Sequence, residues 1–127
     1  MKMGAKFFVC EHCGNLVGMI HDAGVPMMCC GQKMTALVPN TVEASGEKHL
    51  PAVTVEDGAI HVNVGSVDHP MLPEHFIEWV YVQTENGGQR KVLKPGDEPH
   101  VTFFLGDDKA VAVYAYCNLH GLWKTEI

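Results

Sequence analysis

Four of the five cysteines lie within the first thirty residues, at Cys10, Cys13, Cys29 and Cys30. Two residues separate the first pair, a spacing that lets both thiolates bind one tetrahedral ion while backbone amides point at the sulfurs. The adjacent second pair needs a distorted turn to reach the same ion, and Gly31 would relieve the strain. Four sulfur ligands suit iron and zinc equally, so the spacing is compatible both with a structural zinc ion and with a redox-active iron. An odd number of cysteines makes a disulfide framework a poor fit.

A second set of possible ligands lies in the rest of the chain. It consists of four histidines and one cysteine: His49, His69, His75, Cys117 and His120. Taken singly, each is more often a surface or packing residue than a ligand. However, Pro70 and Pro73 restrict the backbone around His69 and His75, and the last two members have the two-residue gap of a chelate. Mixed imidazole and thiolate ligation suits iron, copper or zinc.

Composition excludes several classes of function. The chain has 127 residues, a net charge of -6 and only nine lysines and arginines, which argues against a nucleic-acid partner. No apolar stretch is long enough to span a bilayer, and the N-terminus lacks the apolar core of a secretory signal. We therefore expect a cytoplasmic protein with no membrane contact. An anionic substrate would need a local positive site to offset the negative total.

The sequence divides into a small and a larger predicted domain. Residues 1–37 contain only short apolar runs broken by glycine, too few for a core. So small a unit usually needs a metal or a disulfide to stabilise it, so we expect the four cysteines to have a structural role. The polar, turn-prone stretch at residues 38–46 predicts a linker. The second domain, residues 38–127, is long enough to fold around its own core.

The sequence of the larger domain predicts an antiparallel β-sandwich of the immunoglobulin-like type. Turn compositions separate seven runs rich in β-branched or aromatic residues, at 52–55, 59–64, 76–84, 90–93, 101–105, 110–116 and 122–125. In residues 59–64, the apolar residues Ile60, Val62 and Val64 alternate with polar residues. This pattern is expected for a strand with one buried and one solvent-exposed face. No helical periodicity of useful length appears. The predicted fold class is therefore mainly β.

Several motifs resemble one protein family. Residues 10–15 and 28–34, with their adjacent cysteine pair, resemble the desulforedoxin-type, rubredoxin-like module at the front of desulfoferrodoxins. Residues 47–49, 65–71, 75–79 and 117–123 are similar to the motifs of superoxide reductases. Together they cover essentially the whole chain, and the form that it resembles is the two-iron desulfoferrodoxin.

The resemblance implies two mononuclear iron sites, FeCys4 and FeHis4Cys. The four cysteines of residues 1–37 would hold one iron, which moves the interpretation from zinc to iron. In residues 38–127 the catalytic iron would have four equatorial histidines and Cys117 as axial ligand, with the sixth position open. The implied activity is that of a superoxide reductase, an oxidoreductase that reduces superoxide to hydrogen peroxide in the oxidative-stress defence of an anaerobic or microaerophilic cell. The axial thiolate would donate electron density to the iron.

Two charged residues beside His49 have implied catalytic roles. Lys48 would be the local positive charge that attracts superoxide, and Glu47 would bind the oxidised iron when substrate is absent. In an extended segment, Lys48 would point away from Glu47 and His49. We therefore expect these residues to form an irregular, mobile loop.

The implied partners are a rubredoxin-like or other small electron-donor protein and a second copy of the chain in a homodimer.

The sequence is also compatible with three other functions. These are a rubredoxin-like electron carrier with incidental histidines, a binding module stabilised by zinc, and a dismutase that evolves oxygen without a reductant. We expect His12 and His21 to face solvent, and His61 and His100 to lie outside the site.

Overall fold

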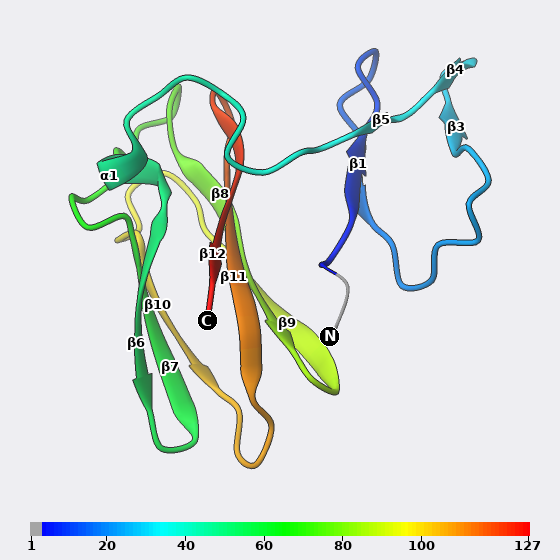
Figure 1. Cartoon of the computed structure of the whole chain (residues 1–127). Coiled ribbons are helices and arrows are strands. Elements are labelled where there is room, and N and C mark those ends of the chain that lie inside the picture. The colour runs from blue at the N-terminus through cyan, green and yellow to red at the C-terminus, as the bar shows by residue number, and fades with distance from the viewer. Residues whose placement is uncertain (1–3) are drawn as a thin grey trace. The chain divides into compact units, whose positions relative to one another are not determined.

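The computed structural model describes residues 4–127, which divide into two compact units. One unit ends at Val38 and the other runs from Pro39 to Ile127; Figure 1 shows the strands of each. No helix in residues 4–127 has the length and hydropathy needed to span a bilayer.

The N-terminal unit contains five very short strands. β1 (Phe7–Val9) pairs with β2 (Leu16–Gly18) and β5 (Thr35–Ala36), while β3 (Met28–Cys29) and β4 (Gln32–Lys33) form a hairpin, all antiparallel. Among the apolar residues described in this unit, Phe7, Cys10 and Met34 are the buried ones. So small a core stabilises a fold weakly, which agrees with the prediction that the four cysteines have a structural role here.

The C-terminal unit is a sandwich of two antiparallel sheets. One sheet has the order β10-β7-β6 and the other β12-β11-β8-β9. Their bounds are β6 Pro51–Glu56, β7 Ala59–Val64, β8 Ile77–Thr84, β9 Gly87–Val92, β10 His100–Phe104, β11 Ala110–Cys117 and β12 Gly121–Glu126. The mainly β fold class is confirmed, and each of the seven predicted strands is present, with ends displaced by up to three residues.

The inner faces of the two sheets form one apolar core. Ile60, Val62 and Val64 of β7 are fully buried, as their alternation predicted, and they pack with Val113 of β11 and other apolar residues. Cys117 is also fully buried and belongs to this same cluster. The last residue of β11 is therefore both a core residue and a possible metal ligand.

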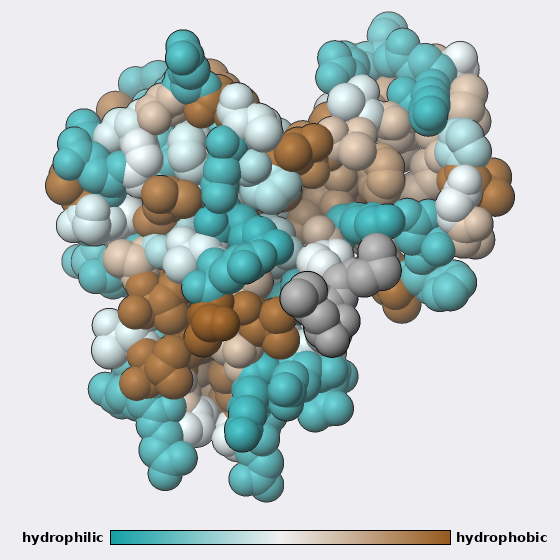
Figure 2. Space-filling view, viewed as in Figure 1, coloured by the Kyte–Doolittle hydropathy of each residue, from teal (hydrophilic) through white to brown (hydrophobic). Residues whose placement is uncertain are grey.

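The two ends of the sandwich differ in chemistry. A single helical turn, α1 (Gly46–His49), precedes β6 at one end. At the other end the β6–β7 and β10–β11 turns carry two acidic pairs, at residues 56–57 and 107–108, and Figure 2 shows hydrophilic side chains over these tips. β6 has six residues and spans about 20 Å, so the acidic turns lie well beyond a Debye length of about 8 Å from α1.

Candidate metal centres

Five side chains converge at the α1 end of the C-terminal unit. One potential ligand atom from each lies within 4.8 Å of the others in the group His49, His69, His75, Cys117 and His120. Three of these side chains come from α1 and the β7–β8 loop, and the other two come from the end of β11 and the turn that follows. The structure thus brings together all five residues that the sequence singled out for this site.

The four imidazole rings form a nearly square arrangement. In the order His49, His69, His75, His120 and back, neighbouring ring centroids are 4.6, 4.7, 5.0 and 4.9 Å apart. Neighbouring planes meet at 78°, 81°, 81° and 83°, whereas the opposite rings of His49 and His75 are 6.4 Å apart and inclined by only 31°. Four nitrogens can therefore point at one centre from four sides.

Hydrogen bonds determine which nitrogen of two rings faces that centre. The Nδ1–H of His49 donates to the carbonyl oxygen of Ser45 at 2.6 Å, and the Nδ1–H of His69 donates to that of Pro70 at 2.7 Å. Because a carbonyl only accepts, both Nε2 atoms of these neutral rings carry lone pairs. These two Nε2 atoms are 3.1 Å apart. Two facing lone pairs at this distance repel one another unless a cation lies between them.

The remaining ligand atoms fit the same interpretation. The Nε2 atom of His75 is buried and has no hydrogen-bond partner among the described residues, which is costly for a polar atom unless it binds an ion. His120 presents Nδ1, which lies 3.1 Å from Nε2 of His49 and 3.9 Å from Sγ of Cys117. A single metal ion would satisfy all of these atoms.

Burial keeps the imidazoles in the form that binds metal. It lowers the pKa of His69 to about 4, below the ordinary 6.5, and lowers the pKa values of His49 and His75 as well. These rings are therefore neutral at pH 7 and have a free lone pair. Burial raises the pKa of the Cys117 thiol, although the backbone N–H groups of Leu119 and His120 act in the opposite direction. A cation at the centre would favour the thiolate.

A β-bulge lies beside Cys117. In the β11–β8 ladder Tyr116 pairs with Trp79, but Cys117 pairs with Ile77, so Glu78 is the extra residue. Bulges occur often next to active sites, because they redirect the side chains at a strand end. Burial raises the pKa of the Glu78 carboxyl.

The segment that carries the two charged candidates is helical, so the expected irregular loop is wrong. Residues Gly46–His49 form one turn of α helix, in which successive side chains differ in direction by about 100° instead of 180°. Glu47 and Lys48 are exposed while His49 is buried. Within residues 4–127, Lys48 has no ion pair. Its charge therefore remains available to an approaching anion. The mobility of this segment stays a prediction.

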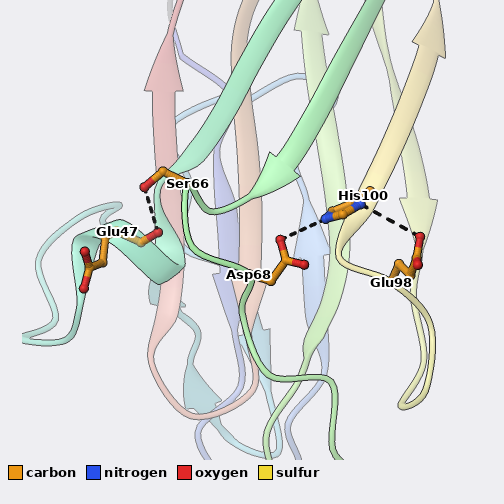
Figure 3. A network of polar contacts seen from close by, with 5 residues as sticks. All are labelled: Glu47, Ser66, Asp68, Glu98 and His100. Atoms are coloured by element: carbon orange, nitrogen blue, oxygen red, sulfur yellow. Dashed lines mark hydrogen bonds and ion pairs between the residues drawn. The ribbon is translucent and has the colours of Figure 1, made fainter.

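The β7–β8 loop holds this turn in place. The carbonyl oxygen of Glu47 accepts a hydrogen bond from the backbone N–H of Val67 at 2.9 Å. It accepts another from the Ser66 hydroxyl at 3.2 Å (Figure 3). A Cβ on Gly65 would lie 2.6 Å from that oxygen and 2.8 Å from the carbonyl oxygen of Leu50. Gly65 therefore allows a close approach that no other residue permits.

The N-terminal unit contains the second group. The four Sγ atoms of Cys10, Cys13, Cys29 and Cys30 lie within 4.8 Å of one another. The Cys13 and Asn15 N–H groups point at sulfurs, at 3.5 and 3.4 Å, and the Cys13 N–H lowers the pKa of Cys10 to about 6. Cys30 has a φ of 53° and Gly31 one of 73°, which confirms the predicted distorted turn. The donor set fits a tetrahedral four-sulfur metal site.

The other histidines lie elsewhere, as predicted. His12 and His21 are exposed. His61 contacts Thr102 and Glu56, and the ring of His100 lies between Asp68 at 2.9 Å and Glu98 at 3.9 Å (Figure 3).

Three residues near the site were not predicted from the sequence. They are Gly65, Ser66 and Trp123. The only sequence feature that could have indicated them is their place in the segments 65–71 and 117–123, which are similar to motifs of superoxide reductases. Their roles depend on contacts with residues distant in sequence.

Comparisons with known proteins identify the family. The sequence model of the Desulfoferrodoxin family matches residues 41–126. The chain is 42% identical over 120 residues to a desulfoferrodoxin homolog of Archaeoglobus fulgidus, with 94% of this chain and 95% of the relative covered. It is 41% identical over 121 residues to the desulfoferrodoxin of Nitratidesulfovibrio vulgaris, with 95% of each covered.

The chain belongs to the desulfoferrodoxin family. Its fold agrees with this assignment: the crystal structure of the superoxide reductase from Treponema pallidum superposes with a TM-score of 0.81 at 41% identity, and covers 98% of this chain and all of that one. The predicted resemblance to desulfoferrodoxins is thus confirmed. The two groups able to hold a metal match the two iron sites expected of such a protein.

Proposed function

We propose that this desulfoferrodoxin is a superoxide reductase whose catalytic iron is held by four histidines and one cysteine. The observation that carries the proposal is the square of four imidazoles with a buried thiol beside it. The proposed ligands are Nε2 of His49, His69 and His75, Nδ1 of His120 and the thiolate of Cys117. This donor set resembles neither a four-sulfur electron-transfer site nor a structural zinc site.

These residues would hold a ferrous ion, which would supply the one electron that superoxide needs to become peroxide; two protons would complete hydrogen peroxide. Each turnover therefore consumes one electron from a donor. This requirement separates a reductase from a dismutase, which recovers the electron by oxidising a second superoxide to oxygen.

The charge of the donor set favours an anionic substrate. The +2 of a ferrous ion and the -1 of the single thiolate of Cys117 would leave +1, because histidine binds a metal as the neutral imidazole. Lys48 adds an exposed cation next to the site, while the acidic turns of residues 56–57 and 107–108 lie at the far end of the sandwich. The Glu47 carboxylate on the same turn offsets part of this positive charge, and the ion together with Lys48 would attract superoxide despite the net charge of -6.

We assign the two charged residues of α1 to catalysis. Lys48 attracts superoxide and positions a water that can donate a proton. Glu47 lies on the same helical turn, and its exposed carboxylate binds the oxidised site in the absence of substrate. The hydrogen bonds from Ser66 and Val67 hold the Glu47 backbone, so such a movement would take place in the side chain.

We further propose that residues 1–37 hold an iron in the four-cysteine site, with an electron-transfer or accessory role, and that residues 38–127 perform the reduction. A small rubredoxin-like donor, a homodimeric assembly and a cytoplasmic location complete the proposal. The backbone N–H groups that point at the sulfurs of Cys10 and Cys13 support thiolate ligation in this unit.

The decisive experiment measures superoxide consumption by iron-loaded protein with a reductant supplied. We expect one electron from the reductant for each superoxide consumed, one hydrogen peroxide formed and no oxygen evolved. Oxygen evolution without a reductant would indicate a dismutase instead.

Optical and electron-spin spectra of the same samples test the sites. The oxidised protein should show two ferric signatures that differ in their number of sulfur ligands. Cys117→Ser should abolish superoxide consumption and remove one signature, while Cys13→Ser should alter only the other. If Cys117→Ser consumed superoxide like the unchanged protein, the proposed ligand set would be wrong.

A further inference from the structure

We infer that Trp123 is a positioning residue that holds His49 and His120 at the angle that one metal ion requires. The inference rests on the proposed function, in which both histidines are ligands. Trp123 is on β12 opposite Ala115, so its indole points toward the inner side of the sandwich, and it is only 5% exposed. It contacts two proposed ligand residues from segments far apart in the chain.

The first contact is with the ring of His49. The indole stacks on this imidazole, with centroids 4.9 Å apart and planes inclined by 29°. The Nδ1–H of His49 already donates to Ser45, so the ring is held at one edge and across one face. These two contacts define the ring plane, and the ring plane determines where Nε2 points.

The second contact is with the backbone of His120. The indole Nε1–H donates to the His120 carbonyl oxygen at 3.1 Å. His120 presents Nδ1 to the site, and Nδ1 is bonded to the ring carbon that carries Cβ. The same two side-chain torsions move Nδ1 and Nε2, but Nδ1 lies nearer to the main chain, so these torsions can compensate for a smaller error in backbone position. A hydrogen bond that holds this backbone therefore matters more for His120 than for the other histidines.

Both contacts act on one short distance. Nε2 of His49 and Nδ1 of His120 lie 3.1 Å apart although 71 residues separate them in sequence. Among residues 4–127, Trp123 is the one side chain that both stacks on the ring of His49 and donates a hydrogen bond to His120. Loss of the indole should widen or twist this pair, while the rest of the sandwich core keeps its own contacts.

Two substitutions separate the contacts. Trp123→Phe keeps an aromatic face against His49 and removes the N–H donor to His120. Trp123→Leu removes both. The matched control is Trp79→Phe, since Trp79 is similarly buried and stacks on Tyr116, with centroids 5.6 Å apart.

The measurement is Co²⁺ binding to the metal-free full-length chain in competition with a chelator, followed by absorption. The one-thiolate and four-thiolate sites give different cobalt spectra, so the four-cysteine site serves as an internal reference in each sample. We expect the affinity of the histidine site to fall about 10-fold in Trp123→Phe and about 100-fold in Trp123→Leu, as for other residues that orient metal ligands. The ligand-field bands of that site should also shift, and Trp79→Phe should match the unchanged protein.

Wild-type affinity and band positions at the histidine site in both Trp123 variants would overturn the inference. So would an equal loss at both metal sites, because it would indicate general destabilisation. If Trp123→Leu does not fold, Trp123→Phe decides alone. Failure of the unchanged protein to bind Co²⁺ at the histidines would overturn the proposed function itself.

Discussion

Nε2 of His49 and Nε2 of His69 lie 3.1 Å apart, each the unprotonated nitrogen of a ring whose Nδ1–H donates to a backbone carbonyl. Without a cation this contact is unfavourable, and with one it becomes half of a metal site. The folded protein should therefore bind a divalent ion far better than the unfolded chain does.

Metal addition should stabilise the C-terminal unit. At a free Zn²⁺ or Fe²⁺ concentration of 100 times Kd, we expect the free energy of unfolding to rise by about 2.7 kcal/mol. His69→Ala should abolish most of this gain, because it removes one of the facing nitrogens. Urea unfolding with and without metal measures it, and His100→Ala, on the outer face beside Asp68, is the control. An equal gain in both variants would contradict the assignment of His69 as a ligand.

Gly65→Ala should displace α1. The new Cβ would lie 2.6 Å from the Glu47 carbonyl oxygen, so the helical turn must move away. We expect the metal-free protein to lose about 1–3 kcal/mol of unfolding free energy, a typical cost of overpacking, and metal affinity to fall as His49 shifts. Urea unfolding and chelator competition test both effects.

Gly87→Ala is the matched control, because Gly87 is exposed on β9 and a Cβ there would meet nothing within 4 Å. If Gly65→Ala behaved like Gly87→Ala, the close approach would have no energetic consequence.

Lys48→Met should slow the reaction with superoxide. Lys48 is exposed and without an ion pair among the described residues, so its removal weakens the attraction of the anion without disturbing packing. We expect the second-order rate constant to fall about ten-fold at low salt and to become less sensitive to ionic strength. Pulse radiolysis over a range of salt concentrations measures both. Lys109→Met, at the far end of the sandwich, should leave the rate unchanged; an equal decrease there would indicate an effect of net charge only.

The metal-free protein should become less stable as the pH falls from 6.5 toward 4. Burial lowers the pKa of His69 to about 4, whereas in the unfolded chain it lies near 6.5. Above pH 6.5 the ring is neutral in both states, so the stability is unaffected. Between pH 6.5 and 4 the unfolded state gains the proton first and is favoured, and below pH 4 both states are protonated.

Urea midpoints against pH would show this decline, and His69→Gln should flatten it. The control His12→Gln, at an exposed position outside the site, should leave the slope unchanged. A midpoint that did not vary between pH 6.5 and 4 would contradict the burial of neutral imidazoles.

Much of the architecture could be predicted from local chemistry. Alternation in residues such as Ile60 and Val62 predicted the strands, because the period of two directly reflects side-chain direction in a sheet. Cys10 and Cys13 were recognisable as ligands because a two-residue gap places both sulfurs near one ion. The segment at Glu47 was predicted wrongly, since four residues are too few to show a helical period.

The amino-acid sequence by itself determined which residue types were available: five imidazole and thiolate ligands, four more cysteines, and strands with one apolar face. Only the tertiary structure decided how they meet. The square of rings, the 2.6 Å approach that excludes a side chain at Gly65, and the position of Trp123 between His49 and His120 all join segments distant in sequence. Local sequence cannot encode such contacts, because they depend on how two sheets and their loops pack, and that packing is a property of the whole core.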